Sequence, residues 1–209
     1  MTVNEIYTKY RTPNNLQQHM LRVAALCTVI VSSWKGEPIS KEDIVNTLLF
    51  HDIAKPVTFD IANQARFVSS PEELVRLEQD IKYLVDNFGS EEHQAALKIF
   101  QDIGLNKNCQ RLINNLEWHN TDDLMRVNDI ESLLTIYCDM RIGPKGVLLI
   151  EQRLSELNAR NPIEDFEKRL KSAKDLENLI IGKVPIKLDE IKEEQISPIA
   201  EMLSQKQFN

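Results

Sequence analysis

Apolar residues recur at helical spacing along most of the chain, and this pattern constrains the fold more than any other feature. The segment after Ser70 is the clearest case, because Pro71 takes the first helical position and Gly89 follows as a stop signal. Its apolar stripe consists of Leu74, Leu77, Ile81, Leu84, Val85 and Phe88. Only six glycines occur in the chain, and no run of alternating apolar and polar residues is sustained. The sequence therefore predicts an all-α fold.

The length of 209 residues suits one domain, or one domain with an appendage. We predict a helical core over residues 1–150, with at least five helices between about residues 13 and 145, and a C-terminal helical extension, residues 151–209, packed on it. Residues 56–69 and 120–128 are predicted as loops. A short β element is expected at most near residues 183–190, because Val184, Ile186 and Leu188 alternate with other residues.

Composition limits the function classes. The formal net charge of −7 disfavours nucleic acid and anionic membranes as partners, but it does not exclude a small anionic substrate. The longest apolar run, residues 23–31, is about half as long as a membrane span, and no signal peptide is visible. Three cysteines without a CxxC pair indicate reduced thiols. These features favour a cytoplasmic protein without a membrane anchor.

All four histidines of the chain fall on predicted inner helix faces, and two aspartates do the same. A single histidine in such a position is more often a hydrogen-bonded core residue than a metal ligand. Six buried polar groups together each need a partner, and one metal centre with a bridging carboxylate would satisfy all of them. The six candidate metal ligands are His19, His51, Asp52, His93, His119 and Asp139.

In this order the candidates resemble the HD-domain superfamily of metal-dependent phosphohydrolases. His19, the pair His51-Asp52 and Asp139 match its shorter pattern, and His93 and His119 match the longer pattern of members with two metal ions. The flanking segments 18–23, 49–55, 89–93 and 137–141 agree as well. The resemblance covers roughly residues 13–145 and leaves out the last third of the chain.

The resemblance implies an all-helical bundle that hydrolyses a phosphoester or phosphoanhydride of a small, nucleotide-like substrate by attack of a metal-bound hydroxide. His51 and Asp52 would be shared ligands, with Asp52 bridging the ions in dinuclear members, so we expect Asp52 to be catalytic. A His-rich, carboxylate-bridged site suits one or two Fe or Mn ions best, with Zn, Co or Ni as alternatives. No Ser or Cys nucleophile is needed, because a bound ion activates water near neutral pH.

Three cations follow the candidate ligands closely. Lys55 comes three residues after Asp52, Arg22 three residues after His19, and Arg141 two residues after Asp139. We interpret them as contacts to a substrate phosphate, with Lys55 also a catalytic candidate. The alternative is that they are solvated charges, which for a lysine at a helix end the macrodipole favours.

Two other functions stay open. The same six-ligand pattern occurs in mixed-valent di-iron oxygenases of the inositol oxygenase type, and the ligands alone cannot separate the two chemistries. A catalytically silent HD module that binds a nucleotide or a protein partner is the other alternative, which an intact ligand set argues against. The Gly-Tyr-Pro signature of cyclic di-nucleotide phosphodiesterases is absent, so that substrate is not assigned. The last helices are expected to cover the core or to form a homodimer contact.

Overall fold

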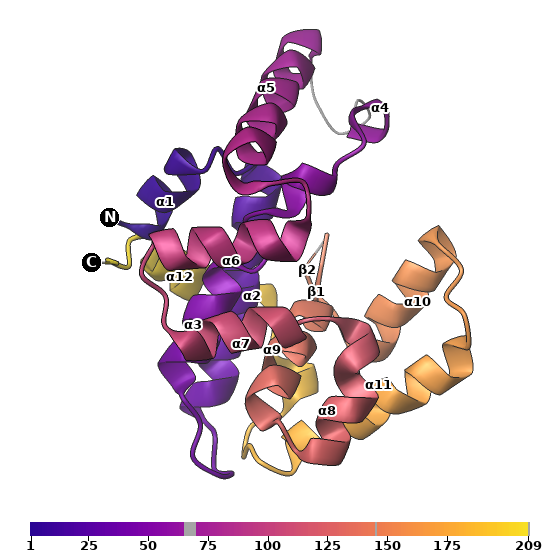
Figure 1. Cartoon of the computed structure of the whole chain (residues 1–209). Helices are drawn as coiled ribbons and strands as arrows, with labels where there is room; N and C mark the ends of the chain where they lie inside the picture. Colours follow the sequence, from indigo (N-terminus) through magenta and orange to yellow (C-terminus); the bar gives the residue numbers. More distant parts are fainter. Residues whose placement is uncertain (65–69, 145, 209) are drawn as a thin grey trace.

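The computed structural model describes residues 1–64, 70–144 and 146–208, and these ranges are helical except for one two-stranded sheet and the connections (Figure 1). The all-α prediction is confirmed. The helices are α1 (Val3–Lys9), α2 (Asn14–Ser32), α3 (Lys41–Phe50), η1 (Lys55–Thr58), α4 (Ile61–Gln64), α5 (Pro71–Phe88), α6 (Glu92–Asp102), α7 (Lys107–Asn115), η2 (Trp118–Asn120), α8 (Thr121–Val127), α9 (Ile130–Arg141), α10 (Ile150–Arg160), α11 (Phe166–Ile181), η3 (Leu188–Glu190) and α12 (Glu193–Ser204).

The sheet is small and lies elsewhere than predicted. Strands β1 (Ile142–Gly143) and β2 (Gly146–Val147) form an antiparallel pair in which Ile142 faces Val147. Residues 183–190, where a β element was expected, instead contain η3 and no strand. The alternation there reflects burial of Val184 and Leu188 against the core rather than strand pairing.

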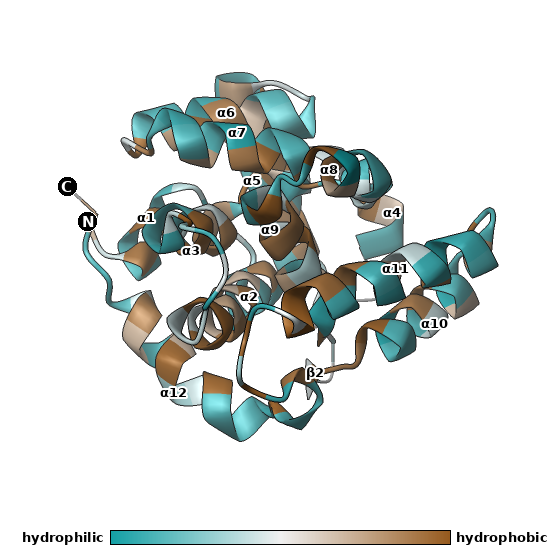
Figure 2. Ribbon diagram, turned by 90° about the horizontal axis from the view of Figure 1, so that it is seen from below, coloured by the Kyte–Doolittle hydropathy of each residue, from teal (hydrophilic) through white to brown (hydrophobic). Residues whose placement is uncertain are grey.

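Helix α2 forms the centre of the fold. It packs against α3, α9 and α12, and residues on several of its sides are fully buried. A helix that is apolar on several sides belongs in the interior. Figure 2 shows the hydrophobic segments of α2 and α9 inside the molecule, whereas the outer sides of α10 and α11 are largely hydrophilic. The central helices α2 and α9, together with the end of α3, carry the candidate site.

Helix α5 begins and ends where its sequence signals predict. The Ser70 hydroxyl accepts a hydrogen bond from the Glu73 amide, and Gly89 ends the helix with a φ of 102°, a left-handed value that favours glycine. The helix projects from the body of the molecule (Figure 1), and Leu84 is its one fully buried residue. Local capping therefore defines α5 more than tertiary packing does.

The predicted loops contain helices. The prediction of a loop at residues 120–128 is wrong, because α8 occupies Thr121–Val127. The helix ends at Asn128, which adopts the left-handed conformation that asparagine tolerates. Residues 56–69 were also predicted as a loop, yet they contain η1 and α4, and residues 65–69 lie outside the described part of the chain. Across the described ranges, we find no helix that combines the length and the apolar composition needed to cross a membrane.

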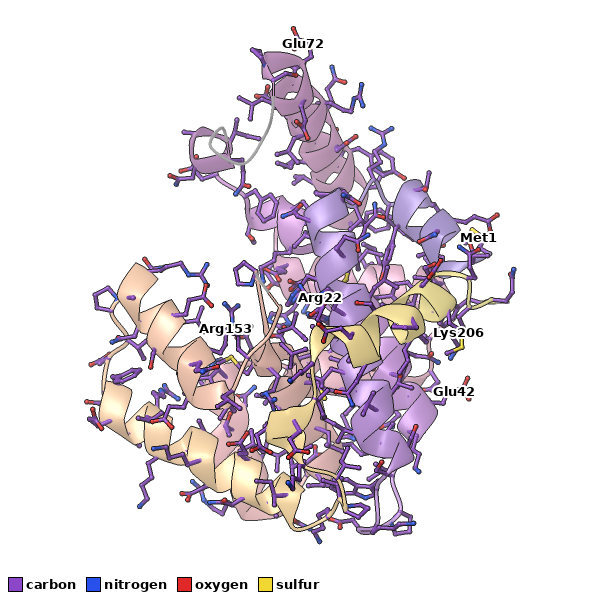
Figure 3. The ribbon with its side chains drawn as sticks, turned by 180° about the vertical axis from the view of Figure 1, so that it is seen from behind. Met1, Arg22, Glu42, Glu72, Arg153 and Lys206 are labelled. Carbon is purple, nitrogen blue, oxygen red and sulfur yellow. The ribbon has the colours of Figure 1, made fainter. Side chains whose placement is uncertain are left out.

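The two chain ends meet on one side of the molecule, where Figure 3 shows Met1 close to Lys206. The Val3 amide donates to the Lys206 carbonyl at 3.0 Å, and the Phe208 amide donates to the Met1 carbonyl at 2.8 Å. Helix α12 thus returns along α2 to the start of the chain. The division into a core and an extension at residue 150 stays a prediction.

Tyr7 connects α1 to the end of α3, and its loss gives a first testable result. Its buried hydroxyl donates to the Leu49 carbonyl at 2.6 Å. Replacing Tyr7 with phenylalanine leaves this carbonyl without its donor, so we expect the free energy of unfolding to fall by about 1 to 2 kcal/mol. Urea unfolding of the wild type and the variant measures the difference, and equal midpoints would contradict the expectation.

Candidate metal centre

Three side chains from different parts of the fold converge. His19 lies on α2, His51 follows the last residue of α3, and Asp139 lies on α9. His19 Nε2 is 2.9 Å from Asp139 Oδ1, and His51 Nε2 is 3.4 Å from the same oxygen. One ligand atom from each residue lies within 4.8 Å of the other two. His19, His51 and Asp139 could therefore hold a metal ion.

The ring of His51 is oriented as a metal ligand would be. Its Nδ1 is 2.8 Å from the Leu48 carbonyl oxygen, which can only accept a hydrogen bond, so Nδ1 carries a proton. In the neutral ring, Nε2 then offers a lone pair toward His19 and Asp139. This nitrogen is buried and has no hydrogen-bond partner among the described residues. An orphaned, correctly oriented imidazole nitrogen fits a metal ion.

Asp52 adds a second carboxylate to this group. Its Oδ2 lies 3.9 Å from both His19 Nε2 and His51 Nε2. Burial opposes protonation of His51, but the carboxylates of Asp52 and Asp139 outweigh it and raise the pKa of His51 to about 9. Burial alone would raise the pKa of Asp139, whereas its hydrogen bond with His19 and its attraction to His19 and His51 hold that pKa well below the usual value. The carboxylates thus create a local field that attracts a positive charge.

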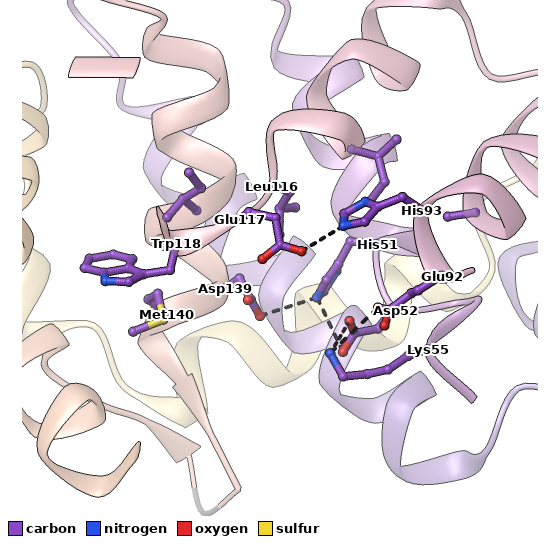
Figure 4. A pocket seen from close by; sticks show the side chains of 13 residues that line it. His51, Asp52, Lys55, Glu92, His93, Leu116, Glu117, Trp118, Asp139 and Met140 are labelled. Atoms are coloured by element: carbon purple, nitrogen blue, oxygen red, sulfur yellow. Dashed lines mark hydrogen bonds and ion pairs between the residues drawn. The ribbon is translucent and has the colours of Figure 1, made fainter. Parts of the chain in front are cut away.

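A cavity of about 190 Å³ opens beside this group (Figure 4). Its polar lining consists of His51, Asp52, Lys55, Glu92, His93, Glu117 and Asp139, and its apolar lining of Ala96, Ile113, Leu116, Trp118, Ile136 and Met140. Lys55 Nζ lies 3.0 Å from Asp52 Oδ1 and 4.0 Å from Glu92 Oε1. Burial opposes the charge of Lys55, but attraction to Asp52 and Glu92 prevails and raises its pKa. The half-exposed ammonium group of Lys55 therefore lies at the cavity, paired with Asp52.

The other two candidate histidines are placed differently. His93 lines the cavity, and its Nε2 is 2.7 Å from Glu117 Oε1. The His119 side chain is 66% exposed, and its nearest carboxylate oxygen, Glu117 Oε2, is 3.9 Å away. Sequence spacing had placed His119 on the inner line of a helix, but α7 ends at Asn115 and the periodicity does not continue to residue 119. The structure does not bring His119 to the other candidate ligands.

Neither predicted arginine contact reaches the cavity. Arg22 is held by Glu193 of α12, with Nε–Oε1 and Nη2–Oε2 distances of 2.6 and 2.8 Å, and Figure 3 shows it beside α12. Arg141 is 1% exposed and donates to the carbonyls of Leu148 and Leu188. Because it follows Asp139 by two residues on α9, it points about 200° around the helix from that ligand. The structure therefore places both arginines away from this cavity, and their contact with a substrate stays a prediction.

The cavity also contains residues that the sequence analysis missed. Glu92 and Glu117 are carboxylates near histidines in the sequence, and Trp118 follows Glu117 directly. Their positions close to His93 and His119 in the sequence were the signal that could have identified them. Glu117 nevertheless lies in the irregular connection after α7, where helical spacing cannot predict a direction.

Comparison with known proteins adds one result to this geometry. A family model described as HD domain matches residues 5–135, which is more than half of the 209 residues. No curated protein and no solved structure gives a significant match. The matched range includes His19, His51 and Asp52 and stops just before Asp139.

Proposed function

The chain belongs to the HD-domain family, and we propose that it is a metal-dependent phosphohydrolase acting on a small, nucleotide-like phosphorylated substrate. The observation that carries the proposal is the convergence of His19, His51 and Asp139 beside a cavity that also contains Asp52 and Lys55. HD domains are typical of metal-dependent hydrolases, and the arrangement of this cavity suits that chemistry. The cleaved bond would be a phosphoester or a phosphoanhydride.

We assign His19, His51, Asp52 and Asp139 as the ligands of a divalent transition-metal ion. Two imidazoles and two carboxylates form a donor set that suits Fe or Mn best, with Zn, Co and Ni as alternatives. A bound ion of this kind lowers the pKa of water to near neutrality and polarises a phosphoryl oxygen. Asp52 is expected to matter most, because its two oxygens face both the histidines and Lys55.

The remaining lining residues would hold the substrate. Lys55 offers its ammonium group to a phosphate oxygen and neutralises charge that develops there. His93, whose Nε2 lies 2.7 Å from Glu117 Oε1, contributes its imidazole to the lining of the cavity. Leu116, Trp118 and other apolar side chains provide a surface for the organic part of the substrate. A cavity of about 190 Å³ and a net charge of −7 favour a small phosphate compound over a long polyanion.

Hydrolysis is favoured over the di-iron oxygenase alternative by the position of His119. The six-ligand arrangement requires His119 as well as His93, and the His119 side chain is largely exposed. Lys55 also places a positive charge inside the cavity, which suits an anionic phosphate substrate better than an uncharged polyol. The silent binding module is disfavoured because the buried polar groups would then be retained without use.

The test is phosphate release from a nucleotide panel by protein that is purified anaerobically and supplied with Mn or Fe. The wild type is expected to release phosphate, and Asp52→Asn is expected to be slower by at least ~100-fold because it loses the ligand charge. Asp123→Asn is the matched control, since the Asp123 side chain is 76% exposed on α8.

Elemental analysis of the same samples shows whether the metal is present. A metal-loaded wild type that releases no phosphate from any compound of the panel would contradict the proposal. Consumption of oxygen with a polyol or a phosphonate would then support the oxygenase alternative.

A further inference from the structure

A second cavity lies at the start of α2, apart from the candidate metal centre. Its volume is about 670 Å³, and it shares no described lining residue with the cavity beside His51. Its walls come from the end of α1, the first turn of α2, the segment around α4 and the first half of α5. Figure 1 shows α1, α4 and α5 at the same end of the molecule. A cavity of this volume with both apolar and polar lining is typical of a small-molecule site.

The first turn of α2 reaches this cavity without a cap. Pro13 precedes the helix and provides no side-chain cap, and the first turn contains no acidic residue. Asn14 and Asn15 line the cavity, and their backbone amides have no acceptor among the described residues. Free amides at the positive end of a helix attract an anion. The helix end therefore favours a negatively charged group in this cavity.

Thr12 adds an unsatisfied hydroxyl at the same place. It lines the cavity and is only 5% exposed, and its Oγ1 has no hydrogen-bond partner within the described ranges. The backbone of Thr12 is satisfied, because its amide donates to the Tyr7 carbonyl at 2.9 Å and its carbonyl accepts from Gln17 Nε2 at 2.7 Å. A buried hydroxyl without a partner costs free energy, which a ligand that accepts its proton would recover.

Two arginines supply positive charge to the lining. The Arg11 guanidinium lies 4.1 Å from the centroid of the Tyr83 ring and 3.3 Å from Asp80 Oδ1, so it is held against α5. Arg76 on α5 is exposed and has neither an ion pair nor a hydrogen bond with any residue that the structure describes. Glu73 and Asp80 also line the cavity and balance the two arginines, whereas the whole chain carries −7. The cavity is thus far less acidic than the chain as a whole.

We propose that this cavity binds a small organic anion, whose phosphate or carboxylate group lies at the start of α2 and whose apolar part lies against Phe59 and Leu77. The anionic group would accept hydrogen bonds from the free amides of α2 and from Thr12, and it would pair with Arg76. Because the lining is separate from that of the metal centre, the inference does not depend on the proposed hydrolysis.

The experiment is a calorimetric titration of the full chain with three probes that share a naphthalene ring: naphthylmethylphosphonate, naphthylacetate and the uncharged naphthylmethanol. The phosphonate has a carbon–phosphorus bond, so hydrolysis of a phosphoester cannot consume it. Arg76→Met and Thr12→Val test the cavity. Lys82→Met is the matched control, since the Lys82 side chain is 75% exposed and pairs with Asp86 on the same helix. Lys55→Met reports whether a probe binds at the candidate metal centre instead.

We expect at least one acid to bind more tightly than the alcohol, and the tighter acid shows whether the site prefers phosphate or carboxylate. Arg76→Met and Thr12→Val should each weaken that binding about 10-fold, because each loses a hydrogen bond to a charged group. Lys82→Met and Lys55→Met should bind the acid like the wild type. Thr12→Val should unfold at the same urea concentration as the wild type or a higher one, because the hydroxyl has no partner to lose.

Three results would overturn the inference. The first is that neither acid binds more tightly than the alcohol. The second is that Arg76→Met or Thr12→Val retains the wild-type affinity. The third is that Lys55→Met loses the binding, which would place the probe at the metal centre.

Discussion

His51→Ala is expected to bind the metal ion at least ~100-fold more weakly than the wild type. Substituting groups that only support a ligand already costs about 10- to 100-fold in affinity, and His51 is assigned as a ligand itself. Its Nε2 is buried, lacks a hydrogen bond within the described residues and faces Asp139 at 3.4 Å. The alanine variant removes this nitrogen and leaves two carboxylates with one imidazole. Titration against a chelator of known affinity, followed by metal analysis, measures the change.

His119→Ala is the matched control for this experiment. The His119 side chain is 66% exposed and lies outside the cavity lining, so the variant should retain the metal with wild-type affinity. Equal losses in the two variants would mean that the longer ligand pattern applies and that His119 moves on metal binding. Unchanged affinity in His51→Ala would reject the metal centre as assigned.

Arg141→Met is expected to lower the free energy of unfolding by roughly 3–5 kcal/mol, because it removes a buried charge on which several acceptors depend. The Arg141 guanidinium donates to the carbonyls of Leu148 and Leu188 and to the Tyr137 hydroxyl, and it lies 3.7 Å from Glu177. It therefore joins α9 to α11 and to the segments before α10 and α12. Methionine keeps much of the volume but leaves these acceptors unpaired.

Arg126→Met tests whether the loss is specific to the buried arginine. The Arg126 side chain is 75% exposed and pairs with Asp123 on the same helix, so its removal should change stability by less than about 1 kcal/mol. Urea unfolding of both variants and the wild type provides the comparison. A cost below about 1 kcal/mol for Arg141→Met would show that the buried network contributes little.

The elements that the sequence predicts well are those with local signals. Helix α5 has its N-cap at Ser70, proline at Pro71 and a terminating glycine at Gly89, and these signals act within a few residues. The loop predicted at residues 120–128 failed for the corresponding reason, because polar residues such as Asp122 and Asp123 also occur on an exposed helix. Burial of Leu124 against the core, which is a tertiary contact, stabilises α8.

The candidate site divides in the same way. His19 and Asp139 lie within long helices, so their inward direction follows from spacing, and they do lie 2.9 Å apart. His119 follows the end of α7, where spacing no longer predicts a direction. Arg22 follows His19 by three residues on α2, but Glu193, which is 171 residues away, binds it. No pattern near Arg22 contains this information.

The hydrogen bonds between the chain ends have a consequence for fraying. Terminal residues are usually poorly ordered unless they are tied down. Here Met1 and Phe208 form hydrogen bonds with each other, and these bonds hold the two ends together. The Phe208 ring contacts Phe50 with centroids 5.2 Å apart, and Tyr7 contacts Phe50 from α1 at 5.9 Å. Phe50 directly precedes His51. Both ends of the chain therefore contribute to the packing around Phe50. Their contacts extend to the residue directly before His51, the most deeply buried of the histidines.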